Sequence, residues 1–363
     1  MQKISKAEAS SFHEHIFLMQ KGEKTGMKIL LTGGAGYIGS HTAVELAKAG
    51  YDVVIADNFS NSSPKVLDRL EQITGKRFPL YEIDVAEKSA LRKVFEENEI
   101  FAVIHFAGYK AVGESVKVPL SYYRNNIDTT LSLLEVMEEF SCKNLVFSSS
   151  ATVYGKRANL PYREDMETGP CTNPYGWTKL FIEQIITDHA KAVPEFSSVI
   201  LRYFNPVGAH ESGLIGEDPN GIPNNLVPYI SRVAVKKLPY LNVFGNDYPT
   251  VDGTGVRDYI HVTDLAKGHV VAIDYAAKNS GAEIFNLGTG NGISVLEMLK
   301  AYEKACGHEI AYKIAPRREG DIATCYADAN KALELLGWKT EFSVDEMCRD
   351  SWNWQSKNPD GYR

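Results

Sequence analysis

Three residues between positions 148 and 179 could together form a proton-transfer site. Ser150 ends an apolar run, and Tyr175 and Lys179 are four residues apart in a predicted helix that begins at Pro174. Residues four apart share one face of a helix, so Lys179 would hold its ammonium near the Tyr175 phenol while Ser150 approaches from a sheet. A nearby cation favours the phenolate and lowers a phenol pKa from its usual value of about 10. We therefore predict that Tyr175 acts as a base near neutral pH, although a surface helix that happens to contain Tyr and Lys would show the same spacing.

A glycine-rich turn lies between a predicted strand and a predicted helix near the N-terminus. Residues 28–32 are apolar and β-branched, as in a strand buried on both faces of a parallel sheet. Gly33, Gly36 and Gly39 follow, and a helix is predicted through residues 42–48. Glycines at this junction allow a tight turn and a close approach of a pyrophosphate to the helix N-terminus. A glycine series is weak evidence alone, but its position here favours a dinucleotide site.

An acidic residue follows the second predicted strand, residues 52–56. Asp57 stands about 20 residues beyond the glycines, where a carboxylate can bond both hydroxyls of an adenosine ribose and repel a 2′-phosphate. The predicted cofactor is therefore NAD rather than NADP. An ordinary turn residue after a strand is the alternative for Asp57.

Strands alternate with helices in the first half of the chain, with a third strand predicted over residues 78–83 and a helix over residues 88–97. This alternation predicts right-handed βαβ units. The predicted fold class is α/β, with a Rossmann-like doubly wound parallel sheet and a smaller mixed α/β substrate lobe. We assign residues 27–204 to the cofactor domain and residues 205–363 mainly to the second lobe. Residues 1–26 precede a second methionine and form an extension of unknown role. The second lobe is predicted to contain a long functional loop over residues 211–228 and strands over 241–244, 256–261 and 284–287. Its predicted helices are one that ends near residue 278 and two over residues 295–304 and 344–355.

The fourth predicted strand, residues 101–106, delivers small residues that suit a flat cofactor. Phe106, Ala107 and Gly108 would let the backbone lie against the cofactor, and Lys110 would reach its ribose or phosphates. His105 stands within the apolar run, so we expect it to be packed in the sheet rather than to bind a ligand.

Composition excludes several classes of partner. The formal net charge of −7 argues against nucleic acid or an anionic membrane surface, either of which favours a basic patch. No apolar run approaches the roughly 20 residues of a membrane span. The five cysteines are widely spaced and contain no CxxC pair, which indicates a reducing, cytoplasmic setting and no metal site.

Eight segments in order from residue 27 onward resemble the UDP-glucose 4-epimerases, also called UDP-galactose 4-epimerases: TGGAGYIGSH, HFAGYKAVGES, SSSATVYG, PYGWTK, LRYFNPVGAH, GIPNNL, GTGVRDYIHV and APRREGD. This family belongs to the extended short-chain dehydrogenases/reductases. The resemblance implies tightly held NAD, a homodimer, and reversible epimerisation at C4 of UDP-glucose and UDP-galactose through a 4-keto intermediate. It implies that Tyr175, Lys179 and Ser150 are catalytic.

The resemblance also implies the two sets of binding residues. The cofactor set is Gly33, Gly36, Tyr37, Ile38, Gly39, Asp57, Asn58, Asp84, Val85, Phe106, Ala107, Gly108, Lys110, Asn125, Ser148, Tyr175, Lys179 and Tyr203. The substrate set is Lys110, Ser150, Tyr175, Asn205, Asn225, Leu226, Asn242, Val243, Phe244, Arg257, Arg318, Asp321 and Cys325. In this family pattern Arg257 and Arg318 bind the diphosphate, although an arginine by itself could equally form a surface ion pair.

Cys325 stands where similar epimerases carry either a bulky tyrosine or a small residue. A small side chain leaves room beside the C2 substituent of the sugar, so we expect UDP-N-acetylglucosamine and UDP-N-acetylgalactosamine to be interconverted as well. An ordinary buried thiol is the alternative, because the neighbouring Tyr326 could fill the space.

Two other functional classes fit parts of this pattern. A nucleotide-sugar 4,6-dehydratase or decarboxylase would share the cofactor and the Tyr-Lys pair, but a dehydratase needs an acid where this chain has Ala151 and Thr152. A non-catalytic NAD-sensing protein would have no reason to combine Ser150, Tyr175 and Lys179.

Overall fold

The structure, a computed structural model, describes residues 24–157, 159–318 and 321–362. Most of the predicted N-terminal extension, residues 1–26, therefore lies outside the described residues. Its last part contacts the main fold, because Lys24 Nζ lies 2.7 Å from Asp274 Oδ1.

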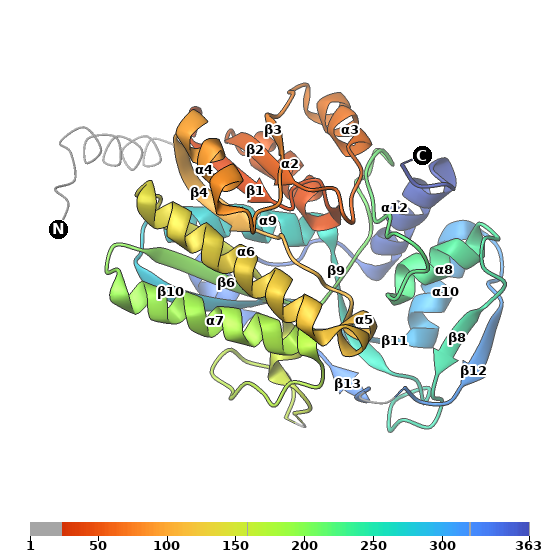
Figure 1. The fold of residues 1–363 in the computed structure, drawn as a ribbon. Coiled ribbons are helices and arrows are strands. Elements are labelled where there is room, and N and C mark those ends of the chain that lie inside the picture. Colours follow the sequence, from red (N-terminus) through yellow and green to blue (C-terminus); the bar gives the residue numbers. More distant parts are fainter. Residues whose placement is uncertain (1–23, 158, 319–320, 363) are drawn as a thin grey trace.

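A seven-stranded sheet forms the centre of the larger part of the molecule (Figure 1). All its pairings are parallel, and the strand order is β10-β6-β5-β4-β1-β2-β3. The strands are β1 (Lys28–Thr32), β2 (Asp52–Asp57), β3 (Leu80–Glu82), β4 (Ile100–His105), β5 (Asn144–Ser150), β6 (Ser197–Tyr203) and β10 (Gly281–Leu287). The predicted doubly wound parallel sheet is confirmed.

Helices cover both faces of this sheet, which explains the apolar character of its strands. The helices are α2 (Tyr37–Lys48), α3 (Lys65–Thr74), α4 (Lys88–Glu97), α6 (Pro119–Glu139), α7 (Pro174–Ala192) and α9 (Val262–Ala276). One hydrophobic core joins α2, α3 and α9 to Ile29 and Leu31 of β1, and a second joins α4, α6 and α7 to Leu30. Successive residues of β1 thus enter opposite cores, as expected for a strand covered on both faces.

The order of the strands reverses at β1, which has β2 on one side and β4 on the other. The loops after β1 and β4 approach each other closely at this point: a Cβ atom on Gly33 would lie 2.9 Å from Ala107 N. Ligands of doubly wound sheets bind in the crevice at such a reversal. The fold therefore places the glycine turn and the loop after β4 on two sides of one crevice.

The remaining elements gather at one side of the sheet around a separate hydrophobic core (Figure 1). They are β7 (Asn205–Val207), β8 (Leu241–Phe244), β9 (Val256–His261), β11 (Gly292–Ser294), β12 (Tyr312–Ala315), β13 (Thr324–Cys325), α8 (Leu226–Ala234), α10 (Val295–Cys306) and α12 (Val344–Lys357). β9 pairs with β7, β11 and β13, and β8 pairs with β12. These elements correspond to the predicted mixed lobe.

Two predicted members of that lobe belong to the large sheet instead. We expected residues 284–287 and the helix before them within the second lobe. The structure pairs β10 in parallel with β6 as the edge strand, and α9 packs on β5 and β6. The prediction is wrong for these elements because an edge strand can join a sheet from any point of the chain. The division at residue 205 otherwise stays a prediction.

Several short elements carry no readable signal in the sequence. The helices α3, α5 (Val112–Lys117) and α11 (Asn330–Leu336) and the strands β11, β12 and β13 were not predicted. β13 has only two residues, and it exists because Thr324 and Cys325 pair with β9. The predicted strand over residues 78–83 is shorter, because only Leu80–Glu82 pairs with β2.

Candidate active site

The end of β5 and the start of α7 bring Ser150 and Tyr175 together. Asn173 caps α7, since its side chain accepts a hydrogen bond of 2.9 Å from Gly176 N, and Pro174 occupies the first turn. Tyr175 thereby stands in the first turn of the helix, where the Ser150 hydroxyl is near enough to its phenol to oppose a rise in the Tyr175 pKa. Ser150 in turn accepts a bond of 3.1 Å from Thr152 Oγ1. The predicted Ser-Tyr contact is therefore present.

Lys179 lies one turn further along α7, and its ammonium is buried against β5. Its Nζ donates to the Ser148 carbonyl oxygen at 2.7 Å and lies 4.8 Å from the centre of the Phe147 ring. The same atom is 5.9 Å from the centre of the Tyr175 ring. Burial lowers the pKa of Lys179 to about 8, although the carboxylate of Glu183 opposes this shift.

The pKa of Tyr175 differs from the expectation. Burial raises it to about 12, and the hydrogen bond from Ser150 only partly opposes that effect. The expectation that Lys179 lowers the pKa of Tyr175 to near pH 7 is wrong for the protein groups acting alone. The physical reason is that Tyr175 is buried, while the Lys179 ammonium is directed at a carbonyl oxygen of the strand.

The glycine turn has the shape that a dinucleotide requires. Gly33 has a φ of +69°, which favours glycine. A Cβ on Gly39 would lie 2.6 Å from Gly33 O, so α2 packs directly on the turn. Gly36 is the N-cap of α2 and offers no side chain to the first-turn N–H groups, which are the groups that bind phosphate at a helix N-terminus.

Asp57 is held rigidly at the end of β2 by two of the loops around it. Its Oδ2 accepts from Ala35 N at 2.9 Å, and its Oδ1 accepts from Phe59 N and Ser62 Oγ at 2.9 and 2.8 Å. The carboxylate is 7 % exposed and bonds the glycine turn. These contacts fix a negative charge beside the turn, so the residues present fit NAD.

The other predicted cofactor residues occupy the same edge of the sheet. The Ser148 hydroxyl bonds the Tyr203 hydroxyl, and burial raises the pKa of Tyr203. Asn125 donates to Asn126 Oδ1 at 3.0 Å. Tyr37 and Ile38 begin α2, and the further members lie in the loops and strand ends already described or directly after β3: Asn58, Asp84, Val85, Phe106, Ala107 and Gly108. His105 bonds Thr32 and Thr130 through its two ring nitrogens, so the prediction that it is packed in the sheet is confirmed.

Four predicted substrate residues are grouped in the second region. The guanidinium of Arg318 lies 4.8 Å from the centre of the Phe244 ring, and its Nε donates to Asp321 Oδ2 at 3.0 Å. Arg257 Nη2 is 3.9 Å from the other oxygen of Asp321. An aromatic face and two cations around one carboxylate suit a base and its phosphates. Asn242 and Val243 are on β8 beside Phe244.

Cys325 connects this group to the catalytic loop. It pairs with Arg257 across β13 and β9, and it packs on a cluster that contains Tyr154 and Phe204. Burial raises the pKa of the Cys325 thiol to about 12. One edge of the Tyr326 ring lies near Gly292 of β11, since a Cβ on that glycine would be 3.7 Å from the ring's Cδ1.

Glu217 was not predicted, yet it lies between residues of both predicted sets. Its Oε1 accepts from Lys110 Nζ at 3.3 Å and from Asn225 Nδ2 at 3.4 Å. Asn225 precedes α8, which begins at Leu226, whereas Asn205 is exposed at the start of β7. Glu217 lies in the long polar loop that the sequence marked as functional, but no local pattern distinguishes it from the other loop residues.

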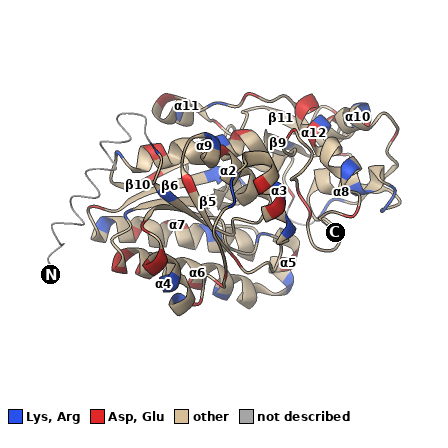
Figure 2. Cartoon of the chain, turned by 90° about the horizontal axis from the view of Figure 1, so that it is seen from above, with Lys and Arg blue, Asp and Glu red and all other residues tan. Residues whose placement is uncertain are grey.

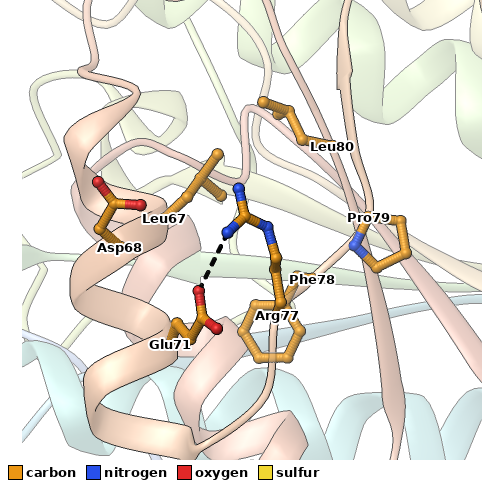
Figure 3. Close-up of a pocket in the computed structure, with 7 residues that line it drawn as sticks. All are labelled: Leu67, Asp68, Glu71, Arg77, Phe78, Pro79 and Leu80. Atoms are coloured by element: carbon orange, nitrogen blue, oxygen red, sulfur yellow. Dashed lines mark hydrogen bonds and ion pairs between the residues drawn. The ribbon is translucent and has the colours of Figure 1, made fainter.

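Neither of two surface hollows coincides with this group of residues. One lies between α3 and the segment before β3, and the residues that line it are Leu67, Asp68, Glu71, Arg77, Phe78, Pro79 and Leu80 (Figure 3). The exposed Arg77–Glu71 pair, with 3.4 Å between Nη1 and Oε2, closes one side. The other is formed mainly by charged residues near 163–165 and 328–331. Neither contains the hydroxyl–phenol–ammonium combination.

Basic and acidic residues are interspersed along the outer helices rather than gathered by sign (Figure 2). Within the described part of the chain, no helix has the length and apolar character needed to cross a membrane. The same residues contain no cluster of three or more His, Cys, Asp or Glu side chains that could hold a metal ion.

Comparison with known proteins identifies the family. The model of the NAD dependent epimerase/dehydratase family matches residues 29–288. UDP-glucose 4-epimerase from Haemophilus influenzae is 60% identical over 337 residues, which are 93% of this chain and 100% of that protein. The chain belongs to the UDP-glucose 4-epimerase family.

A second relative and a solved structure agree with this family. UDP-glucose 4-epimerase from Bacillus subtilis is 60% identical over 93% of this chain and 99% of its own length. The structure of UDP-glucose 4-epimerase from Bifidobacterium longum, in complex with NAD+ and UDP, matches with a TM-score of 0.90 and 58% identity. That match covers 92% of this chain and 100% of the other. The predicted family and fold are confirmed, whereas the role of each site residue stays a prediction.

Asp57→Asn should weaken the preference for NAD over NADP by at least about tenfold. The change keeps the shape of the side chain but removes the charge that would face a 2′-phosphate, and like charges in contact cost several kcal/mol. The measurement is the affinity of cofactor-free protein for each nucleotide. Asp52→Asn, the same change at the opposite end of β2, is the control and should leave the ratio unchanged. Equal affinities of the parent protein for NAD and NADP would contradict the role of Asp57.

Proposed function

We propose that this chain interconverts UDP-glucose and UDP-galactose by reversible oxidation at C4, with bound NAD. The observation that carries the proposal is the meeting of Ser150, Tyr175 and Lys179 at the carboxyl edge of a parallel sheet, beside the glycine turn and Asp57. Family membership supports the same reaction. The arginines and the aromatic ring of the second region would hold the uridine diphosphate.

Each protein group has a distinct part in this reaction. Tyr175 removes the proton of the 4-hydroxyl, and Ser150 relays it through the hydrogen bond between the two side chains. Lys179, held by the Ser148 carbonyl, binds the cofactor ribose and favours the phenolate. NAD, when bound, would accept the hydride that leaves C4 and would later give it back. The 4-keto sugar then presents its other face, C4 takes the hydride back, and Tyr175 returns the proton to the oxygen, so the reaction involves no net oxidation.

The two rival functions lack support at particular positions. A 4,6-dehydratase needs an acid after Ser150, where Ala151 and Thr152 begin a short 3-10 helix. A non-catalytic NAD sensor has no use for a buried phenol bonded to a serine. A direct assay separates the three: the purified protein with UDP-galactose should form UDP-glucose without net consumption of NAD, and denaturation should release NAD.

Tyr175→Phe should lower turnover by about a hundredfold or more while folding and UDP-sugar binding stay nearly intact, because only the ionisable oxygen is lost. Lys179→Met should slow the reaction and move its acid limb to higher pH, since removal of the cation raises the pKa at which Tyr175 becomes a base. The measurement is kcat against pH. Tyr312→Phe, an exposed tyrosine on β12, is the control. A Tyr175→Phe rate within about threefold of the parent would contradict its role as base.

A homodimer through α6 and α7, in the cytoplasm, completes the proposal. These helices run side by side and carry exposed apolar residues, with Leu131 at 41% and Phe181 at 42% exposure (Figure 1). Phe181 lies 6.1 Å from Tyr123 and 5.5 Å from Trp177 between ring centres, which makes one aromatic patch. The five free cysteines suit a reducing compartment.

Phe181→Glu should convert the dimer into a monomer, because a charge would be buried at the centre of the apolar contact. Sedimentation equilibrium measures the mass. Leu335→Glu makes the same kind of change at an exposed leucine of α11 and should leave the dimer intact. A parent protein that sediments as a monomer would overturn the dimer.

The Cys325 position should set which sugars react. Cys325 packs on the Tyr154 cluster, and its small side chain would leave more room there than a tyrosine would. We expect turnover of both N-acetylhexosamine and hexose substrates by the parent. Cys325→Tyr should suppress only the acetylated reaction, by about tenfold to two-hundredfold. The control is Cys325→Ser, which keeps a small side chain at this position and should keep both activities. A tyrosine at Cys348 would not be a control, because that thiol is buried in another core. An equal loss of both reactions in Cys325→Tyr would contradict the gate.

A further inference from the structure

A row of buried polar residues crosses three neighbouring strands where α7 covers the sheet. Ser149 of β5, Arg202 of β6 and Asn286 of β10 are in register and are 0, 3 and 0% exposed. Strands covered on both faces are normally filled with aliphatic side chains. A polar row at this depth therefore needs a specific cause.

Glu183 of α7 accepts hydrogen bonds from two members of the row. Ser149 Oγ donates to Glu183 Oε1 at 2.5 Å, and Arg202 Nη2 donates to Oε2 at 2.6 Å. Arg202 Nε makes a further bond of 3.0 Å to Oε1. The side chains of Arg202 and Glu183 are only 4 and 5% exposed. One carboxylate thus ties α7 to both β5 and β6.

The position of Glu183 relates this tie to the proposed chemistry. It lies one turn beyond Lys179 on α7, and Lys179 lies one turn beyond Tyr175. The strand residues that these three contact are consecutive: Lys179 bonds Ser148, Glu183 bonds Ser149, and Tyr175 bonds Ser150. The helix is therefore attached to the end of β5 at three successive residues.

The third member of the row extends the attachment to the edge strand. The Arg202 guanidinium lies 4.9 Å from the centre of the Tyr154 ring, and the Tyr154 hydroxyl donates to Asn286 Oδ1 at 2.7 Å. Asn286 Nδ2 donates to the Tyr162 carbonyl at 2.8 Å. Tyr154 and Tyr162 belong to the cluster on which Cys325 packs. The row therefore also anchors one wall of the sugar site.

Stability alone does not account for an ion pair at this depth. Replacement of a buried pair by apolar residues of similar volume is often neutral or stabilising, because both charges lose their hydration. Apolar packing, however, lets a helix settle in more than one register, whereas directional bonds to a carboxylate allow one. Catalytic groups must be held within about 0.5 Å of the productive geometry.

We propose that Glu183, through Ser149 and Arg202, is a positioning residue that holds Tyr175 and Lys179 against the end of β5 for the reaction. This inference rests on the proposed function of the site. Glu183 does not touch the reacting atoms, so its removal should affect turnover more than substrate binding.

The charge of Glu183 also acts on Lys179. Tyr175 and Glu183 face this ammonium from α7, and His105 faces it from β4. From β6, the Tyr203 hydroxyl bonds the hydroxyl of Ser148, whose carbonyl oxygen accepts from the ammonium. Burial lowers the pKa of His105 to about 3, so this ring is neutral at physiological pH. The carboxylate of Glu183 favours the charged form of Lys179 and opposes the effect of burial.

Ser149→Ala is the first test, because it removes one bond to Glu183 while Arg202 still neutralises the carboxylate. We expect kcat to fall by about tenfold or more, with KM for UDP-galactose within about twofold of the parent and bound NAD unchanged. Ser198→Ala is the matched control, since this buried hydroxyl of β6 has no hydrogen-bond partner among the described residues. It should leave kcat unchanged.

The double variant Glu183→Gln/Arg202→Gln is the second test, because it removes both charges and leaves neither unpaired. Loss of the carboxylate should move the alkaline limb of the kcat profile to lower pH, since Lys179 would lose its proton more readily. A purely structural role would lower the yield of folded protein without such a shift. A profile that superimposes on that of the parent would overturn the charge effect.

The outcomes separate this inference from the proposed function. A parent protein without C4 epimerisation would refute the proposed function itself. An active parent whose Ser149→Ala variant has a kcat within about twofold of normal would refute only the positioning role. A fall in kcat matched by an equal rise in KM would refute it as well.

Discussion

The buried ammonium of Lys179 is the interaction on which the site depends. A charge with 5% exposure loses most of its hydration, and that loss must be offset by protein groups. Here the carbonyl of Ser148, the face of the Phe147 ring and the nearby carboxylate of Glu183 share this task. Because two of these groups are on β5, the helix that carries Lys179 must lie against this strand. Tyr175 and Ser150 are brought together by the same constraint.

The parallel sheet concentrates chemistry at one edge. The carboxyl ends of β1, β2, β4 and β5 carry the glycine turn, Asp57, the Ala107 loop and Ser150, all at the same edge because the strands run in one direction. The reversal at β1 opens the crevice between two of these loops. The close approach of Gly33 to Ala107 leaves no room for a side chain there, so glycine is required by packing as well as by its φ.

Burial shifts the pKa values of Tyr175 and Lys179 in opposite directions. It raises the pKa of Tyr175 to about 12 and lowers that of Lys179 to about 8, because in each case the neutral form is favoured away from water. Burial therefore favours the uncharged form of each side chain more than water does for a free side chain. A cation held beside the phenol would oppose the effect of burial on the pKa of Tyr175.

The sequence by itself determined the alternating pattern of the first half, the glycine turn and the acid after the second strand, since these depend on local periodicity and backbone freedom. It also determined the spacing of Tyr175 and Lys179, because a helix fixes which residues share a face. It did not determine that β10 and α9 return to the large sheet, because strand pairing over long separations has no local signal. The tertiary structure alone decided the direction of the Tyr175 pKa shift, which follows from full burial. It also decided the places of Glu183 and Glu217, whose partners come from separate elements, so only the folded chain brings them within bonding distance.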